Sequence, residues 1–463
     1  MKCTHLLLTS LALVCVPLLA QSNPVPLIYQ PLSPASVNPG HAGFTLTVHG
    51  TGFVQGAVIK ANGTPLKTQF FNSHTVKANV PPQAVAKAGT GLITVANPAS
   101  IDSNVAYLPV RDRSETVRLA PDRNVSDAGR VAVGDFNGDR RPDITVSWGN
   151  LKKSGSYIDT FLSSGNGKFT KTGGFQPIYL NHRGPNVVGD FNNDGKLDLA
   201  VYDTDDSPDT WYDFFLGDGN GGFSAAPVSR NVMGTAADIN GDGKLDFVGV
   251  IWDGYLWYLQ VSFGAGDGTF SSLPWVELTM PYDGQPAVGD FNGDGKLDAA
   301  VPSNSGVVAV LLGKGDGTFR QEVDFVSAFP QTRAAVADLN GDGKLDIVTN
   351  GVSVLLGDGH GNFSANGGVA LQGYEAGNIE LGDWNGDGKL DVATVTDVQG
   401  LQFLNLALGN NDGTFAAPFT FGENLGNTGW NDLGIGDFNS DGRLDFAVSG
   451  NKAVTVLTQA PAP

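Results

Sequence analysis

The nine residues from Asp290 to Asp298 read DFNGDGKLD, and six further copies of this acidic segment run through the chain. The other copies are DFNGDRRPD (Asp135 to Asp143), DFNNDGKLD (Asp190 to Asp198), DINGDGKLD (Asp238 to Asp246), DLNGDGKLD (Asp338 to Asp346), DWNGDGKLD (Asp383 to Asp391) and DFNSDGRLD (Asp437 to Asp445). Their first residues are 45 to 55 positions apart. A tandem repeat of about 50 residues indicates one supersecondary unit that is used seven times.

Each repeat predicts four short strands around its acidic segment. A strand such as Val131 to Val133 precedes the segment, a second such as Leu199 to Val201 follows it, and a third such as Val307 to Leu312 leads to a glycine-rich turn that ends in Phe. Four strands per repeat are typical of a propeller blade. The sequence therefore predicts an all-β chain in which residues 115–458 form a seven-bladed β-propeller.

The two ends of this array complement each other. The seventh repeat lacks the glycine-rich turn and the fourth strand, while Glu115 to Ala120 has the pattern of a fourth strand with no repeat before it. We therefore expect residues 115–120 to complete the last blade, since closing the ring removes exposed strand edges. Residues 459–463 are then a short tail.

A smaller β-domain is expected before the repeats, at residues 35–110. Phe44, Leu46 and Val48 alternate with threonines, as in a half-buried strand. Further short strands separated by Gly, Pro and Asn-Gly turns bring the expected total to about seven, the size of an immunoglobulin-like β-sandwich.

The N-terminus has the pattern of a secretory signal peptide. Lys2 precedes an apolar stretch that reaches Leu19, and Ala20 offers a small residue for cleavage. We expect a signal peptide at 1–20 and a Pro-rich linker at 21–34. Both cysteines, Cys3 and Cys15, lie in the first segment, so the mature chain would contain no disulfide.

The net charge of −19 is concentrated in the repeats, because the seven segments hold 21 of the 47 acidic residues. This acidity disfavours nucleic acid and anionic membranes as partners. No stretch beyond the signal peptide has the length and hydropathy for membrane insertion, and we expect a secreted or cell-surface monomer.

The acidic segments place side-chain oxygens at positions 1, 3, 5 and 9, and oxygen-only donors favour Ca²⁺. An EF-hand reading fails because none of the seven copies has Glu at position 12. We expect about seven structural calcium sites, one in each copy. The expected ligands are Asp135, Asn137, Asp139, Asp143; Asp190, Asn192, Asp194, Asp198; Asp238, Asn240, Asp242, Asp246; Asp290, Asn292, Asp294, Asp298; Asp338, Asn340, Asp342, Asp346; Asp383, Asn385, Asp387, Asp391; and Asp437, Asn439, Asp441, Asp445.

Two other positions of the segment carry structural information. Position 2 is apolar in every copy, which predicts that it packs beneath the loop and couples the loop to the core. Arg140 stands at position 6, where the other six copies have Gly. A side chain at a left-handed turn position costs about 1 kcal/mol, so we expect the first site to be the weakest or most distorted.

These features resemble two known families. The seven acidic repeats resemble the FG-GAP/VCBS repeats, including those of the integrin α-subunit propeller. The segments LSPASVNPG (32–40), FTLTVHGTGFVQGAVIKANGTPL (44–66) and GLITVANP (91–98) resemble an IPT/TIG domain over residues 27–110. The resemblance implies calcium bound by the Asp, Asn, Asp and Asp of each copy, and a spacer or interaction role for the N-terminal domain.

A ligand site is expected on the opposite face of the ring, where the variable loops lie. Aromatic residues beside carboxylates and amides suit sugar recognition, and we single out Trp148, Tyr202, Trp211, Trp252, Tyr255, Trp257, Tyr282, Tyr374 and Trp430. Packing of these rings between blades is the alternative reading. No catalytic residue is assigned, because the nucleophile, zinc-protease and Walker motifs are absent.

Three functions are compatible with these patterns. The first is a calcium-stabilised extracellular propeller for adhesion or for binding a glycan or protein ligand. A propeller-based carbohydrate-active enzyme, either a polysaccharide lyase or a hydrolase, is the alternative, and a structural surface-layer component is the third.

Overall fold

The computed structural model describes residues 24–460 apart from 115–116, 127–128, 150–155, 173, 176–185, 204–210, 228–231, 283, 331, 370, 372–376, 399–400, 422–431 and 450–452. The regular secondary structure of the described residues is almost entirely β-strand, as the sequence predicts. The helical element within this part of the chain is one 3₁₀ turn at Pro82–Val85. None of the helices in the described residues has the length and hydropathy needed to cross a membrane.

Each acidic repeat contributes one four-stranded antiparallel sheet, and the sheets are numbered 1 to 7 in chain order. The first strands are β10 (Arg130–Gly134), β14 (Val187–Gly189), β18 (Thr235–Ala237), β23 (Ala287–Gly289), β27 (Ala334–Ala337), β31 (Ile379–Gly382) and β35 (Leu433–Gly436). The second strands are β11 (Asp143–Gly149), β15 (Asp198–Asp203), β19 (Asp246–Trp252), β24 (Asp298–Ser303), β28 (Asp346–Thr349), β32 (Asp391–Val398) and β36 (Asp445–Ser449).

The third strands are β12 (Ser156–Ser163), β16 (Trp211–Gly217), β20 (Trp257–Gly264), β25 (Val307–Leu311), β29 (Ser353–Gly357), β33 (Leu401–Ala407) and β37 (Val454–Gln459). Six sheets take their fourth strand from the same repeat: β13 (Phe169–Lys171), β17 (Phe223–Ala225), β21 (Phe270–Ser272), β26 (Val323–Val326), β30 (Phe363–Gly368) and β34 (Phe419–Phe421). Sheet 3 has an additional strand, β22 (Val276–Leu278), which pairs with β20.

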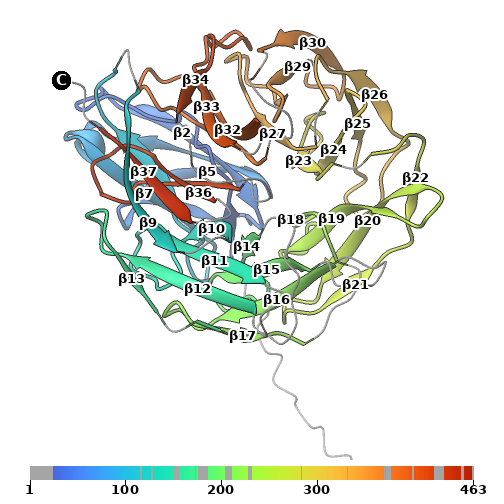
Figure 1. The fold of residues 1–463 in the computed structure, drawn as a ribbon, viewed down its shortest axis with the longest axis horizontal. Coiled ribbons are helices and arrows are strands. Elements are labelled where there is room, and N and C mark those ends of the chain that lie inside the picture. Colours follow the sequence, from blue (N-terminus) through green and yellow to red (C-terminus); the bar gives the residue numbers. More distant parts are fainter. Residues whose placement is uncertain are drawn as a thin grey trace, which may run out of the picture.

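The sheets are arranged around a common centre, with their first strands inside and their fourth strands outside (Figure 1). Each first strand contacts the first strand of the next sheet, and β35 of sheet 7 contacts β10 of sheet 1. The core lies between the sheets: Ala132 of sheet 1 packs with Leu199 and Val201 of sheet 2. Residues Ile144 and Phe438 share a cluster that joins sheet 1 to sheet 7.

The fourth strand of sheet 7 comes from the N-terminal side of the repeats. Strand β9 (Leu119–Ser126) pairs antiparallel with β37, and Gln459 lies opposite Leu119. The strand therefore lies four residues further along the chain than the predicted range of 115–120. Gln459 is part of β37 and is buried, so the predicted tail at 459–463 begins one residue too early.

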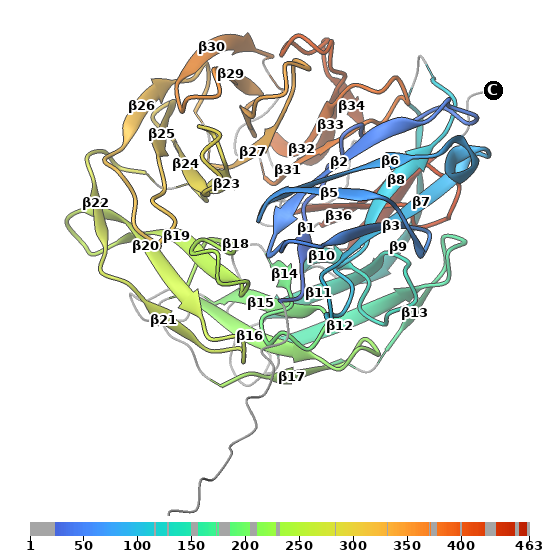
Figure 2. The same cartoon turned by 180° about the vertical axis from the view of Figure 1, so that it is seen from behind.

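The N-terminal domain is a sandwich of two four-stranded sheets, in the orders β1-β2-β6-β5 and β4-β3-β7-β8. Its strands are β1 (Leu27–Ile28), β2 (Phe44–Thr51), β3 (Val58–Ala61), β4 (Thr64–Pro65), β5 (Thr68–Asn72), β6 (Thr75–Val80), β7 (Gly89–Ala96) and β8 (Ala106–Val110). Seen from behind, the sandwich lies against one face of the ring (Figure 2).

The predicted linker at 21–34 is wrong from Leu27 onward. Strand β1 pairs with β2, and the side chains of Ile28 and Leu32 are buried in the sandwich core. The four prolines between positions 24 and 34 give the stretch a linker-like composition. Two buried aliphatic side chains and a short edge strand hold this stretch in the sandwich despite its composition.

Candidate functional site

Each acidic segment forms the connection between the first and second strands of its sheet. In sheet 4, β23 ends at Gly289, and Asp298 opens β24 directly opposite Gly289. The aspartate at position 9 is the first residue of the second strand in all seven sheets. The segments are therefore hairpin loops on one face of the ring, and we call them acidic loops 1 to 7.

The aspartate at position 9 joins three parts of its own sheet. In loop 4, the Phe291 N–H donates to Asp298 Oδ2 (2.8 Å), and the Gly313 N–H donates to Asp298 Oδ1 (2.7 Å). Equivalent bonds occur in the other six sheets, where the donor pairs are Phe136 and Ser163, Phe191 and Gly217, Ile239 and Gly264, Leu339 and Gly357, Trp384 and Gly409, and Phe438 and Gln459. This side chain locks the loop and the end of the third strand to the second strand.

The oxygens at positions 1, 3 and 5 accept hydrogen bonds from the loop's own backbone. In loop 4, Asp290 Oδ1 and Asn292 Oδ1 both accept from the Asp294 N–H, at 3.1 and 2.8 Å. Asp290 Oδ2 accepts from the Gly295 N–H, and Asp294 Oδ1 accepts from the Lys296 N–H. The same four bonds are present in every loop.

Burial makes these carboxylates electrostatically costly. All seven position 9 aspartates are 0% exposed. The pKa of Asp298 is raised to about 7, mainly by burial and in addition by the charges of Asp290 and Asp294, against the opposing effect of the N–H donors. The pKa of Asp246 is raised to about 8 for the same reasons. A positive charge placed among these oxygens would therefore stabilise the loops.

The donor set fits a hard cation, since each loop offers only carboxylate and amide oxygens at the expected positions. In the part of the chain that the structure describes, no group of three His, Cys, Asp or Glu side chains is gathered tightly enough to hold a metal. The carboxylate oxygens of the three aspartates in each loop accept hydrogen bonds from backbone N–H groups. Cation binding would use the remaining lone pairs of the same oxygens.

The side chain at position 2 links each loop to the neighbouring sheet, as well as to its own core. The ring of Phe291 packs edge-on against Phe363 of sheet 5 (5.4 Å between ring centres), and its carbonyl accepts the Gly361 N–H of that sheet. The corresponding N–H to carbonyl bonds join Gly167 to Phe438, Gly221 to Phe136, Gly268 to Phe191 and Gly413 to Leu339. The Gly167–Phe438 bond connects sheet 1 to sheet 7, across the two ends of the repeat array.

The N-terminal sandwich covers part of the acidic loop face, which sequence reasoning did not anticipate. The Ser36 hydroxyl donates to Asp383 Oδ2 in loop 6, and the Thr90 hydroxyl donates to Asp437 Oδ2 in loop 7. In loop 3, the Asp238 N–H donates to Thr51 Oγ1 (3.1 Å). Partners such as Ser36 and Asp383 are 347 residues apart, and no local sequence pattern signals them.

Arg111 reinforces the contact between the sandwich and the ring. Its guanidinium donates to the Asp383 carbonyl (2.7 Å) and to Gln459 Oε1 (3.0 Å), and both bonds are buried. These bonds join loop 6 and the third strand of sheet 7, β37, to the end of the sandwich. The sandwich is therefore bound to first-position aspartates and to sheet 7, where the two ends of the repeat array pair.

Arg140 adopts the left-handed backbone conformation that its position requires, with φ of +68°. The glycine at position 6 of the other loops has φ between +81° and +84°. Loop 1 keeps the same internal hydrogen bonds as the others, including Arg140 N–H to Asp135 Oδ2 at 2.7 Å. The expected distortion of the first loop is therefore absent from its hydrogen bonds, while the conformational cost of Arg140 remains.

The predicted ligand-face aromatics have different environments. Trp252 and Trp257 lie opposite each other in β19 and β20 with stacked rings, and Trp252 is 59% exposed. Tyr255, at the tip between these strands, is 90% exposed. Tyr202 is half-buried and packs against Tyr212.

Tyr282 is a correction to the predicted ligand face. It is 0% exposed, lies in the core cluster of sheets 3 and 4, and its hydroxyl donates to Asp324 Oδ1 at 2.5 Å. Trp148 and Trp211 belong to β11 and β16, but their side chains lie outside the described set, as do residues Tyr374 and Trp430 entirely.

Sequence reasoning missed a second aromatic pair on sheet 3, which lies on the opposite face of the sheet from Trp252 and Trp257 because Tyr258 directly follows Trp257 in β20. Trp275 is half-exposed and its ring lies 5.4 Å from that of Tyr258. The Tyr258 hydroxyl donates to Asp253 Oδ2 (3.1 Å) at the turn between β19 and β20. The aromatic-rich stretch 252–258 could have indicated Tyr258, whereas Trp275 comes close to Tyr258 only through the pairing of β22 with β20.

Comparisons with known families agree with the repeat architecture. The FG-GAP-like repeat family matches residues 135–201, 190–249, 238–301, 290–349 and 383–448, and the IPT/TIG domain family matches residues 27–108. Both families are typical of extracellular or surface proteins. Curated proteins give no match.

Solved structures give distant similarities. An auxiliary nutrient binding protein from Bacteroides ovatus is 9% identical, with 94% of this chain and 98% of that chain covered and a TM-score of 0.38. BBS1N in its complex with ARL6DN is 12% identical, with coverages of 76% and 98% and a TM-score of 0.41. A putative phosphatase from Bacteroides thetaiotaomicron is 13% identical, with coverages of 95% and 98% and a TM-score of 0.31. At these TM-scores the similarities support no inference about ligand or activity.

Replacing Arg140 with glycine should stabilise the protein. The substitution removes the left-handed strain of a residue with a side chain and should raise the free energy of unfolding by about 1 kcal/mol. Denaturant unfolding measures this change. Gly343→Ala is the matched control and should destabilise by a similar amount, because no atom lies within 4 Å of the added Cβ and only the conformational cost remains. If Arg140→Gly unfolded at a lower denaturant concentration than the original protein, the backbone of Arg140 would not be strained.

Proposed function

Because this chain belongs to the family of FG-GAP-like repeat proteins, we propose that its seven sheets are the blades of one seven-bladed β-propeller. The contact between β35 and β10, the pairing of β9 with β37 and the Gly167–Phe438 bond support a closed ring. The propeller domain would then run from about residue 117 to Gln459, preceded by an IPT/TIG domain that begins near Leu27. A signal peptide at 1–20 would direct the protein to the cell surface or the exterior, where it would act as a monomer.

The acidic loops would bind calcium as structural sites. The observation that supports this assignment is the recurrence, in all seven loops, of a fully buried aspartate beside two further aspartates and an asparagine. When bound, calcium would neutralise the carboxylates that burial destabilises. Asp and Asn at positions 1, 3, 5 and 9 would supply the side-chain ligands, with the same set in loop 1 despite Arg140.

The uniformity of the loops favours a structural role for calcium over a catalytic one. Extracellular modules bind calcium with dissociation constants of about 10⁻⁴ to 10⁻³ M. At about 1 mM free calcium each loop would contribute about 0.4–1.4 kcal/mol, so seven loops would contribute about 3–10 kcal/mol. Whole domains have net stabilities of about 5–15 kcal/mol. Calcium would therefore decide whether this disulfide-free ring stays folded.

The exposed aromatic hairpin of sheet 3 is the best-supported site for an extracellular glycan. It joins the second and third strands, and thus lies on the opposite face from the acidic loops. The stacked pair of Trp252 and Trp257 presents a flat apolar surface, and the exposed Asp253 follows Trp252 at the turn as a hydrogen-bonding group. Flat aromatic surfaces next to polar groups suit the CH faces and hydroxyls of sugars. The chain's acidity favours neutral over anionic glycans.

Removal of calcium should lower the melting temperature of the protein by about 5–20 °C, as expected for a loss of about 3–10 kcal/mol from a domain of this size. Differential scanning calorimetry with and without a calcium chelator measures the shift. Restoring calcium should recover the original melting temperature. An unchanged melting temperature after complete chelation would exclude calcium as the stabilising group.

Loss of the hydroxyls of Ser36 and Thr90 should weaken the docking of the sandwich on the propeller. Each bond to a charged group contributes about 1.5–3 kcal/mol, so Ser36→Ala combined with Thr90→Val should speed hydrogen exchange in both loops 6 and 7. Thr45→Val is the control, because the Thr45 hydroxyl bonds to Asn79 within the sandwich. Unchanged exchange in the double variant would show that apolar contacts alone hold the domains together.

Trp252→Ala should weaken binding to neutral glycans by tenfold or more, equivalent to about 1.4 kcal/mol, because it removes half of the stacked surface. A glycan array in the presence of calcium identifies the ligand, and titration of the best hit gives the affinity. Phe419→Ala removes an exposed aromatic ring on sheet 6 and should have no effect. An assay for new reducing ends or unsaturated products with the same glycan tests the enzyme alternative, and turnover would favour a lyase or hydrolase over a binding protein.

A further inference from the structure

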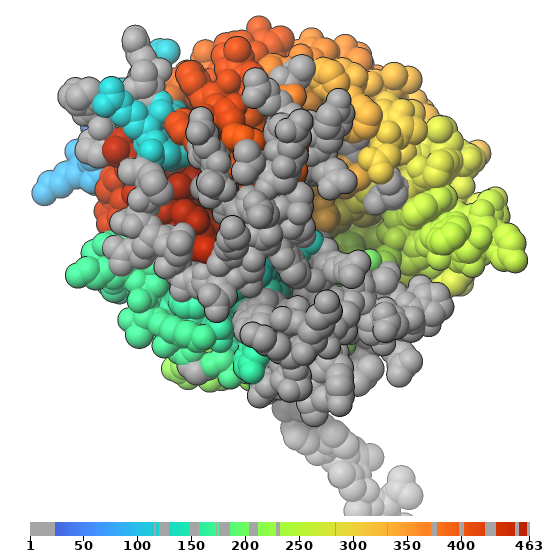
Figure 3. Space-filling view, in the orientation of Figure 1, coloured from blue at the N-terminus to red at the C-terminus, as the bar shows by residue number. Residues whose placement is uncertain are grey.

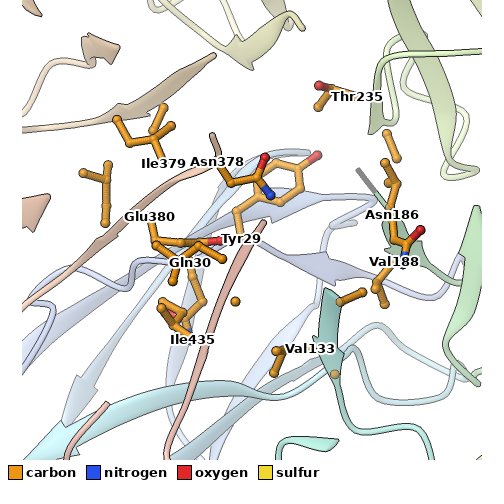
Figure 4. Close-up of a pocket in the computed structure, with 18 of the residues that line it drawn as sticks. Tyr29, Gln30, Val133, Asn186, Val188, Thr235, Asn378, Ile379, Glu380 and Ile435 are labelled. Atoms are coloured by element: carbon orange, nitrogen blue, oxygen red, sulfur yellow. The ribbon is translucent and has the colours of Figure 1, made fainter. Parts of the chain in front are cut away.

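A cavity of about 550 Å³ lies on the axis of the ring, where the first strands of all seven sheets meet the sandwich. Tyr29 and Gln30 of the sandwich border it together with residues of the first strands, among them Glu380 (Figure 4). Small-molecule sites in proteins commonly enclose about 300–1,000 Å³. The volume is therefore sufficient for a compound of monosaccharide size.

Figure 3 shows the opposite side of the ring, away from the sandwich.

Glu380 is the feature of this cavity that the fold itself does not require. It stands three residues before the first aspartate of loop 6. The residues at the same place in the other six sheets are all uncharged: Ala132, Val187, Thr235, Ala287, Ala335 and Gly434. Six sheets thus form and pack with a neutral residue at this position. A carboxyl group in the seventh has no evident role in holding the sheet.

The carboxyl of Glu380 has no compensating partner among the residues that the structure describes. Its side chain keeps some accessible surface because it lines the cavity. Burial alone raises its pKa to about 8, and no hydrogen bond or charge from the described residues contributes. Ionised carboxylates in such surroundings are costly unless they are paired. The ionised form of Glu380 is therefore energetically unfavourable, and a cation inside the cavity would stabilise it.

The cationic side chain of Arg333 does not neutralise Glu380. Arg333 lines the same cavity, but its electrostatic partners are Tyr212 and Asp432, and no ion pair joins it to Glu380 among the described residues. Asn378 lies two residues before Glu380, and residues two apart on an extended strand face the same side. Both line the cavity, so an acid and an amide are offered together (Figure 4).

We propose that the axial cavity binds a small organic ammonium compound that carries hydroxyl groups, with Glu380 pairing with the ammonium group. Asn378 and Gln30 are the amide side chains that would meet the hydroxyls. The charge of Glu380 selects a cation, and the volume and the amide groups favour an amino sugar or amino alcohol over a bare metal ion. This site is separate from the aromatic hairpin of sheet 3 and does not depend on the ligand proposed there.

Isothermal titration of the calcium-loaded full chain with glucosamine and with glucose tests the proposal. Both sugars have the same ring, but only glucosamine carries an ammonium group. Glucosamine should bind at least tenfold more tightly than glucose, and ethanolammonium should compete with it. Equal binding of the two sugars, or no binding of either ammonium probe, would overturn the proposal.

Glu380→Gln keeps the shape of the side chain and removes its charge. This variant should bind glucosamine at least tenfold more weakly, while its melting temperature without ligand should equal or exceed that of the original protein. Glu277→Gln is the matched control: it removes an exposed charge on β22 and should leave glucosamine affinity unchanged within twofold. Trp252→Ala should also leave it unchanged, which separates this site from the surface site. Unaltered glucosamine affinity in Glu380→Gln would assign the binding to another group.

Discussion

A buried aspartate at the start of the second strand is the interaction on which the rest of the ring depends. One of its oxygens holds the loop that precedes it, and the other holds the end of the third strand. Because the same residue occurs in all seven sheets with the same donors, each sheet is braced at the same corner. Burying a carboxylate is unfavourable even with two N–H donors, so this brace creates a demand for positive charge in every loop.

The loops also transmit that constraint beyond their own sheets. The apolar residue at position 2 packs against the next sheet and accepts one of its backbone hydrogen bonds, while Ser36 and Thr90 of the sandwich bond to the first aspartates of loops 6 and 7. Cation binding at a loop would therefore affect its sheet, the neighbouring sheet and the docked domain together. The seven repeated loops are better understood as a framework than as seven separate binding functions.

Specificity resides where the repeats differ. Among the residues that the structure describes, a stacked tryptophan pair, Trp252 and Trp257, is found in sheet 3 alone, and Glu380 occupies a place that is uncharged in the other six sheets. A feature that only one of seven equivalent positions carries is not needed for the common fold. For this reason these two places, on the outer face and on the axis, are the strongest candidates for ligand recognition.

The amino-acid sequence alone determined the repeat number, the four-strand unit, the strand borrowed from the N-terminal side and the spacing of the acidic loops, because all of these depend on local periodicity and turn chemistry. It misassigned the segment at 27–34 and placed Tyr282 on the surface, since composition does not reveal which apolar side chains find a partner. Only the tertiary structure decided that the sandwich covers the loop face, and that Trp275 packs against Tyr258. Those contacts join residues far apart in the chain, and they depend on shape and hydrogen-bond complementarity that no short segment contains.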